Sequence, residues 1–173
     1  NTGLGQGMAV ALAQAGAKVV LVGRRSCDET AGKIAAFGGE CTQVLADLSL
    51  KESVQAVLSG ALSAYRRVDI LVNNAGIIKR CDAIDVSEQD WDAVINVNLK
   101  MVFLLSQAFA RQFEKQNEGG KIINVCSMLS FQGGIRVPAY TASKSAVMGL
   151  TKALANEWAP KGIQVNAIAP GYM

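Results

Sequence analysis

The sequence predicts an α/β fold, a doubly wound parallel sheet with helices on both faces, from two observations. Short apolar runs alternate with longer helical stretches along the chain, which is the pattern of successive strand–helix–strand units. Half of the 173 residues are hydrophobic, which is enough to bury one sizeable core. No repeat, low-complexity stretch or interior linker interrupts the pattern. We therefore expect residues 1–173 to form a single domain with right-handed connections between its strands.

The elements are expected in the following order. The strands are apolar runs rich in Val, Ile and Leu, at 18–22, 41–46, 68–72, 121–126 and 163–168. A helix of small residues is expected at 8–15, and further helices at 28–37, 51–65, 87–93, 99–114 and 139–158. Ser87 followed by Asp90 indicates a helix start, Gly119 and Gly120 indicate the end of the helix before them, and Pro138 suits the first turn of the last helix.

Two glycine-containing turns are candidate binding segments. Residues 3–7 read Gly-Leu-Gly-Gln-Gly directly before the first helix, whose free N–H groups are suited to hold a pyrophosphate. Residues 73–76 read Asn-Asn-Ala-Gly after a predicted strand, where small residues let backbone approach a flat ligand closely. An ordinary tight turn explains either segment equally well when it is taken alone.

The chain contains no histidine, so acid–base chemistry near neutral pH has to come from another side chain. Tyr140 and Lys144 are four residues apart on a predicted helix and therefore share a face. The lysine ammonium and the positive end of the helix dipole both favour the charged phenolate. This spacing also arises by chance on amphipathic helices. Ser127 strengthens the assignment, because it follows a predicted buried strand at the sheet edge where ligands gather.

Taken in this order, the segments resemble the short-chain dehydrogenase/reductase family over essentially the whole chain. The resemblance implies a Rossmann-type sheet and catalysis by Asn98, Ser127, Tyr140 and Lys144. Tyr140 would exchange a proton with the substrate oxygen, and Ser127 would hydrogen-bond the same oxygen. Lys144 would assist the tyrosine and bind the nicotinamide ribose, and Asn98 would link the lysine to a proton relay. No metal is required. The implied cofactor-binding residues are Gly3, Leu4, Gly5, Arg24, Asp47, Leu48, Asn74, Ala75, Gly76, Tyr140, Lys144, Pro170 and Gly171.

The same resemblance makes the chain look like a fragment. The first glycine of the family's glycine motif would precede Asn1, so Gly3 and Gly5 match only the second half of that motif. We expect the first strand and the C-terminal strand and helix of the family to be missing. The functional assignment therefore concerns the full-length protein, for which the family implies a homotetramer paired through the long helices.

The residues that follow the predicted strand at 18–22, which corresponds to the second strand of the family, bear on the choice between NAD and NADP. An acidic residue there would accept the adenine ribose hydroxyls of NAD, whereas this chain has Gly23, Arg24 and Arg25. Guanidinium groups pair well with a 2′-phosphate, so the sequence favours NADP, with Arg24 as the first candidate and Arg25 as the second. Two solvated surface arginines are the alternative.

The loop at 127–138 resembles that of sugar-acid dehydrogenases of the family. Arg136 is a candidate for a substrate carboxylate and Gln132 for a hydroxyl, with Arg80 as a second candidate arginine. We therefore expect hydride transfer between a nicotinamide cofactor and a deoxy-keto sugar acid. The alternatives are a 3-oxoacyl-thioester or general carbonyl reductase, in which Arg136 is a surface residue, and a non-catalytic sensor of NAD(P).

Charge and cysteine content narrow the class of partner. The formal charge of +3 is too small, without a concentrated basic stripe, to indicate nucleic acid as a partner. The four cysteines have no metal-type spacing, and no uninterrupted apolar stretch has membrane-spanning length. We expect a reduced, cytoplasmic protein acting on a small molecule, although a targeting peptide before Asn1 would change this location.

Overall fold

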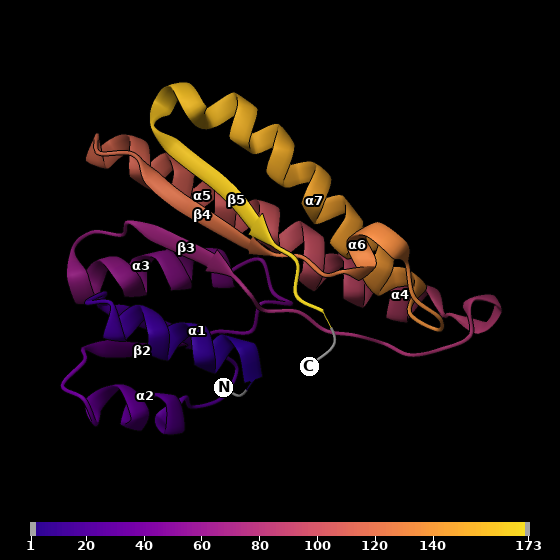
Figure 1. The fold of residues 1–173 in the computed structure, drawn as a ribbon, viewed down its shortest axis with the longest axis horizontal. Helices are drawn as coiled ribbons and strands as arrows, with labels where there is room; N and C mark the ends of the chain where they lie inside the picture. Colours follow the sequence, from indigo (N-terminus) through magenta and orange to yellow (C-terminus); the bar gives the residue numbers. More distant parts are fainter. Residues whose placement is uncertain (1–2, 172–173) are drawn as a thin grey trace. The chain divides into compact units, whose positions relative to one another are not determined.

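The computed structural model describes residues 3–171 and contains two compact units, Asn1–Arg67 and Val68–Met173. Each unit has its own parallel sheet, β1–β2 in the first and β3–β4–β5 in the second. Figure 1 shows the elements of both. A parallel α/β fold is therefore confirmed, with its strands in two sheets. That residues 1–173 behave as one domain stays a prediction.

The first unit alternates helices and strands. Its elements are α1 (Gly3–Gln14), β1 (Val19–Gly23), α2 (Asp28–Ala35), β2 (Cys41–Leu45) and α3 (Ser53–Tyr65). Val19 pairs with Cys41 and Gly23 with Leu45, so the strands run in register from end to end. Ala13, Leu21, Cys27 and Ile34 form a buried cluster that joins α1 and α2 to β1.

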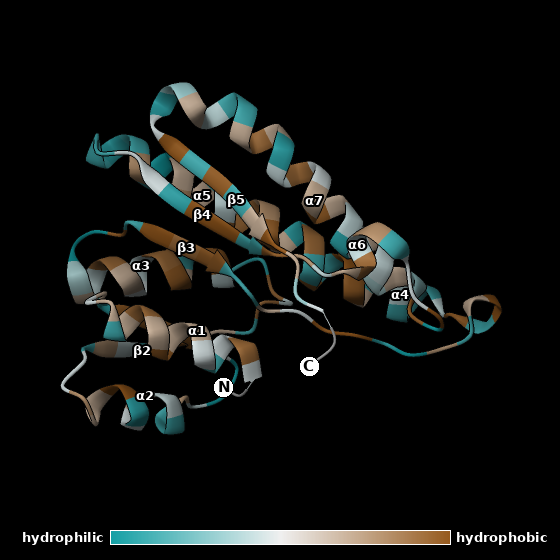
Figure 2. Cartoon of the chain, viewed as in Figure 1, coloured by the Kyte–Doolittle hydropathy of each residue, from teal (hydrophilic) through white to brown (hydrophobic). Residues whose placement is uncertain are grey.

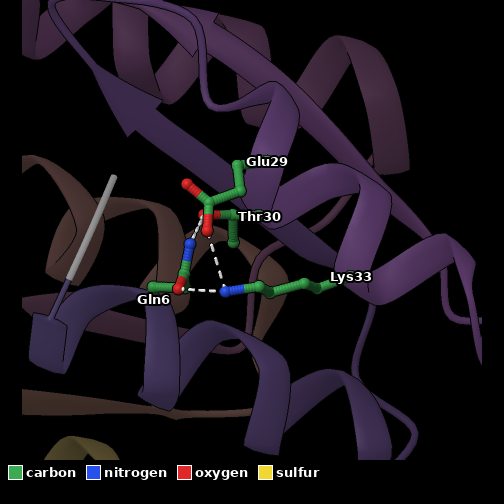
Figure 3. A network of polar contacts seen from close by, with 4 residues as sticks. All are labelled: Gln6, Glu29, Thr30 and Lys33. Carbon is green, nitrogen blue, oxygen red and sulfur yellow. Dashed lines mark hydrogen bonds and ion pairs between the residues drawn. The ribbon is translucent and has the colours of Figure 1, made fainter.

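Polar contacts also join α1 to α2 (Figure 3). Gln6 donates to the buried Thr30 hydroxyl at 3.1 Å and accepts from the Lys33 ammonium at 2.6 Å. Lys33 also pairs with Glu29 at 2.9 Å. Gly3, Gly5 and Gly7 lie inside α1, although the sequence predicts a glycine turn there and glycine disfavours helix by about 1 kcal/mol. The hydrogen bonds of Gln6 with α2 help to hold this end of the helix. The helix starts five residues before the predicted residue 8.

The second unit contains the longer helices. Its elements are β3 (Ile70–Asn73), η1 (Ala83–Asp85), α4 (Glu88–Ile95), the π-helical turn η2 (Asn96–Lys100), α5 (Met101–Gln116), β4 (Gly120–Val125), α6 (Leu129–Gln132), α7 (Pro138–Trp158), η3 (Ala159–Lys161) and β5 (Ile163–Ile168). The predicted start signals are confirmed: the amide N–H of Asp90 donates to the Ser87 hydroxyl at 3.1 Å, and Pro138 opens α7.

Buried asparagines show which face of the second sheet the helices cover. The Asn73 amide in β3 donates to Ser106 of α5 and to Asn124 of β4, at 3.0 and 2.8 Å. Asn124 in turn donates to Thr151 of α7 at 2.9 Å. Because side chains alternate across a strand, α5 and α7 pack on the same face. In Figure 2, β3 is hydrophobic along most of its length and hydrophilic at its end, where Asn73 precedes the Asn74 turn.

Two predicted helices are one continuous run. The sequence predicts separate helices at 87–93 and 99–114, but α4, η2 and α5 follow one another without a break. The predicted helices leave residues 94–98 outside them, and the asparagines and valines of this stretch have low helix propensity. The chain instead makes a π-helical turn, and Asn98 within it is fully buried.

The run Glu88–Gln116 is long and apolar enough to cross a membrane by length and composition, with a window of mean hydropathy 1.5. It also carries the core residues Met101, Val102, Leu105, Phe109 and Phe113, all of them buried. A core helix passes the same test of length and composition, so this feature does not by itself indicate a membrane.

Candidate active site

The carboxyl ends of three parallel strands and the start of α7 come together in the second unit. The amide of Cys126, just after β4, donates to the Ile168 carbonyl at the end of β5, at 2.8 Å. Two residues further, Met128 donates to the Pro170 carbonyl at 3.0 Å. Ser127 therefore lies beside the Pro170–Gly171 segment, as expected for residues at one edge of a parallel sheet.

Tyr140 and Lys144 share one face of α7. The Lys144 ammonium lies 5.7 Å from the centroid of the Tyr140 ring, so the two groups are neighbours. The ammonium donates to the Val125 carbonyl at 2.6 Å, and its side chain is 5% exposed. Burial lowers the pKa of Lys144, against the opposing influence of the Cys126 thiol. The sequence predicts the Tyr140–Lys144 pair but not the contact with the carbonyl.

Asn98 is held by three hydrogen bonds. Its Oδ1 accepts from the Ile77 amide at 2.8 Å, and its Nδ2 donates to the Ile77 carbonyl at 2.9 Å. The same nitrogen donates to the Ser143 hydroxyl on α7 at 3.2 Å. Asn98 thus joins the π-helical turn to the segment after β3 and to the helix that carries Tyr140. A single π-turn of this kind is frequent at functional sites.

The turn at 74–76 lies close to two of the predicted catalytic side chains. A Cβ placed on Gly76 would lie 3.2 Å from Asn98 Oδ1 and 3.7 Å from Lys144 Nζ, so the backbone here lies against both side chains. An ammonium has three donors, and the described residues accept one of them. Two donors remain for ribose hydroxyls, and the residues present fit the nucleotide that the sequence implies.

Ser127 is buried beside α6, a short helix that the sequence does not predict. Its hydroxyl accepts from the Leu129 amide at 3.2 Å, so its own proton is not used in this hydrogen bond. The neighbouring Cys126 is buried in an apolar cluster with Val102 and Val147. Burial raises the pKa of the Cys126 thiol, with Lys144 and Ser130 acting in the opposite direction, so this cysteine stays protonated.

The two candidate substrate residues are exposed. Gln132 ends α6, and Arg136 lies in the loop before α7 with a positive φ of 63°. Arg136 Nε pairs with Asp82 at 2.8 Å, and its carbonyl accepts from the Cys81 amide at 3.0 Å. Arg136 therefore joins its loop to the segment before η1.

The remaining predicted cofactor residues lie in the first unit. Gly3, Leu4 and Gly5 are in the first turn of α1, and Arg24 follows β1. β2 ends at Leu45, and Asp47 and Leu48 follow it after Ala46. Hydrogen bonds from the backbone and side chain of Ser49 lower the pKa of Asp47, and the charge of Arg24 contributes. Arg24 and Asp47 therefore lie at the same edge of the β1–β2 sheet.

Comparisons with known proteins agree with this architecture. The family model of the short chain dehydrogenases matches residues 1–173. The 2-dehydro-3-deoxy-D-gluconate 5-dehydrogenases of Dickeya dadantii and Escherichia coli are 60% and 56% identical over all of this chain, and the match covers 68% of each. A crystal structure of a candidate 2-deoxy-D-gluconate 3-dehydrogenase from Agrobacterium tumefaciens, with bound NADP, is 52% identical with a TM-score of 0.90, and the alignment covers 99% of this chain and 68% of that one.

Proposed function

This chain belongs to the short-chain dehydrogenase family, and we propose that it is the NADP-dependent oxidoreductase of a deoxy-keto sugar acid, such as 2-dehydro-3-deoxy-D-gluconate or 2-deoxy-D-gluconate. The observation that carries the proposal is the buried Lys144 ammonium, 5.7 Å from the Tyr140 ring centroid, in a chain 60% identical over its whole length to a dehydrogenase of this substrate class. The pair supplies a proton donor in a protein that has no histidine.

The reacting oxygen would be held by two side chains. Tyr140 donates a proton to the substrate carbonyl, or accepts one from the alcohol in the reverse direction. Ser127 donates a hydrogen bond to the same oxygen and stabilises the charge that develops there. Lys144 stabilises the deprotonated tyrosine, and its donors that do not reach Val125 bind ribose hydroxyls. Asn98 keeps the π-helical turn against Ile77.

The nicotinamide supplies the hydride when it is bound. In the second unit, Asn74, Ala75, Gly76, Pro170 and Gly171 would line its nucleotide, together with Tyr140 and Lys144. In the first unit, the N-terminal turn of α1, with Gly3, Leu4 and Gly5, would hold the pyrophosphate. Asp47 and Leu48 would contact the adenine, and Arg24 would pair with the 2′-phosphate. The NADP in the Agrobacterium relative supports this choice of cofactor.

Arg136 and Gln132 would recognise the sugar acid. A guanidinium has five donors, so Arg136, whose Nε contacts Asp82, has further donors for a substrate carboxylate. The ion pair and the hydrogen bond from Cys81 fix the loop, which reduces the conformational entropy lost on binding. Gln132 is exposed at the end of α6 and would donate to a hydroxyl.

We also propose that the protein is a cytoplasmic homotetramer and that residues 1–173 act as one domain. Small residues on α7, Ala146, Gly149 and Ala153, are exposed and would let a second helix approach closely. Ala108 on α5 is partly buried and Phe109 is only 4% exposed, so Phe109 packs within the subunit.

The test is a substrate screen of the intact protein with the Tyr140→Phe variant as control. Nicotinamide absorbance is followed with NADP or NADPH and a panel of deoxy-keto sugar acids, 3-oxoacyl thioesters and simple ketones. We expect turnover with sugar acids, and at least a hundred-fold lower kcat for Tyr140→Phe, since general acid–base catalysis contributes roughly 10²–10⁴-fold. Preference for acyl thioesters would contradict the substrate class, and unchanged turnover of Tyr140→Phe would contradict the role of the tyrosine.

A further inference from the structure

One hydroxyl joins the proposed catalytic asparagine to the backbone of the proposed catalytic tyrosine. Ser143 is fully buried on α7, three residues after Tyr140 and one before Lys144. Its Oγ accepts from Asn98 Nδ2 at 3.2 Å and donates to the Tyr140 carbonyl at 2.7 Å. Asn98 is itself tied to both backbone groups of Ile77. A continuous chain of hydrogen bonds therefore runs from the segment after β3, through the π-helical turn, to the first turn of α7.

The same helix carries a second relay of the same chemistry, two turns further on. Thr151 donates to the Val147 carbonyl at 2.7 Å and accepts from the buried Asn124 amide at 2.9 Å. In both places a hydroxyl of α7 bonds a backbone carbonyl of the preceding turn and accepts from an asparagine of a neighbouring element. The Thr151 relay joins α7 to the middle of the sheet, away from Tyr140. A comparison of the Ser143 and Thr151 relays therefore separates the effect of anchoring α7 from the effect of positioning Tyr140.

The position of the first relay matters because it binds the Tyr140 backbone directly, whereas the other anchors of this turn are the buried side chains of Val137 and Ala139. Tyr140 is partly exposed, and the loop before it, at 134–136, is exposed. Lys144 is fixed from the other side by the Val125 carbonyl. A shift of the Tyr140 backbone would therefore move the phenol relative to a stationary ammonium.

We propose that Ser143 is a positioning residue: its hydroxyl fastens the first turn of α7 to the Asn98 amide and so holds the Tyr140 phenol beside the Lys144 ammonium. The inference rests on the proposed proton-transfer role of Tyr140. Ser143 does not touch the substrate in this scheme. Its effect on the reaction passes entirely through the placement of Tyr140.

The experiment compares Ser143→Ala with Thr151→Val in the intact protein. Each variant removes one buried hydroxyl and leaves one buried asparagine N–H without its acceptor, so we expect similar losses of stability. Only Ser143→Ala should lower kcat, by roughly ten- to hundred-fold as for a misplaced reacting group, with KM changed by less than about two-fold. The limb of its pH–rate profile that reports proton transfer should move to higher pH. Thr151→Val should keep the kcat and the profile of the parent protein.

Hydrogen exchange without cofactor gives a readout that does not depend on activity. The Lys144 amide, whose helical acceptor is the Tyr140 carbonyl, should exchange faster in Ser143→Ala and at the parent rate in Thr151→Val. If Ser143→Ala does not fold, Ser143→Cys carries the comparison, because a thiol keeps the shape and is a weaker hydrogen-bonding group.

Equal kcat and pH profiles for Ser143→Ala and the parent would overturn the inference, as would an equal loss of kcat in Thr151→Val. The parallel Tyr140→Phe variant separates this failure from failure of the proposed function. An inactive Tyr140→Phe beside a fully active Ser143→Ala rejects only the role of Ser143. An active Tyr140→Phe rejects the role of the tyrosine itself.

Discussion

At the scale of single residues, the buried lysine is the most costly group of the site. An ammonium loses its hydration when it is buried, and for Lys144 one carbonyl, that of Val125, compensates for this among the described residues. The lowered pKa of Lys144 expresses the same cost, because burial disfavours the charged form. The site therefore keeps a charge beside Tyr140 at the expense of folding stability.

Because of this cost, the free energy of unfolding should depend on pH, and Lys144→Met should remove that dependence. Between the lowered pKa of folded Lys144 and its unfolded value of 10.5, the unfolded state binds more protons, so the free energy of unfolding rises with pH. Below the lowered pKa both states are protonated and the cost is present in full. In urea unfolding between pH 7.5 and 10.5, the parent protein should gain stability relative to Lys144→Met. Parallel curves for the two proteins would contradict the prediction.

The sequence could predict local pairs of residues but not their distant partners. Tyr140 and Lys144 are found from a spacing of four, because helical geometry alone puts them on one face. The Val125 carbonyl lies 19 residues away, and the Asn98–Ser143 contact spans 45, so both depend on tertiary packing. Ser143 lies within the Tyr140–Lys144 segment. Its spacing of three from Tyr140 is the only sequence signal for its hydrogen bond to that carbonyl.

At the scale of elements, strand and helix types follow from hydrophobic periodicity, while boundaries and junctions do not. The predicted strand at 163–168 matches β5 at both ends, and the other strands agree within about two residues. The π-helical turn was missed because propensity treats Asn96, Val97 and Asn98 as weak helix formers. Packing overrides that preference, since the Asn98 amide makes two hydrogen bonds with the Ile77 backbone that a break would expose.

The turn before β4 gives an element-scale prediction. Gly119 has a φ of +70°, and a Cβ on it would lie 2.3 Å from the Gly162 carbonyl oxygen at the start of β5. Gly119→Ala should lower the free energy of unfolding by about 2–4 kcal/mol through left-handed strain and overpacking. Gly32→Ala, in α2 with nothing within 4 Å of its Cβ, should instead stabilise by about 0.5–1 kcal/mol. Chemical denaturation measures both, and a neutral Gly119→Ala would show that the turn can relax.

At the scale of the whole molecule, the sequence predicts parallel pairing but not the division into sheets. Apolar runs alternating with helices require parallel strands, which is what β1–β2 and β3–β4–β5 are. Which strands pair with one another depends on side-chain packing between elements, and the sequence of one apolar segment does not determine it. The two groups of predicted cofactor residues follow this division, with Arg24 and Asp47 in the first unit and Lys144 in the second.

Cofactor binding should be visible in the stability of the whole protein. A ligand at 100 times its Kd stabilises the folded state by about 2.7 kcal/mol, which for a chain of this size raises Tm by roughly 5–10 °C. NADP should produce such a shift in the parent protein, and a clearly smaller one in Arg24→Asp. Arg25→Asp makes the same change of charge one residue later and should reduce the shift less. An undiminished NADP shift in Arg24→Asp would contradict the assignment of Arg24 to the phosphate.

The burial of Lys144 separates it from the other lysines among residues 3–171, all of which are exposed. Reagents that couple to primary amines need access to the nitrogen, and the surface lysines offer this access. Protonation does not distinguish them in the same direction, because burial lowers the pKa of Lys144 and favours its unprotonated form. The ammonium beside Tyr140 is hydrogen-bonded to Val125 and shielded by the surrounding chain. We therefore expect attachment to a solid matrix or cross-linking to take place at the surface amines before it reaches Lys144.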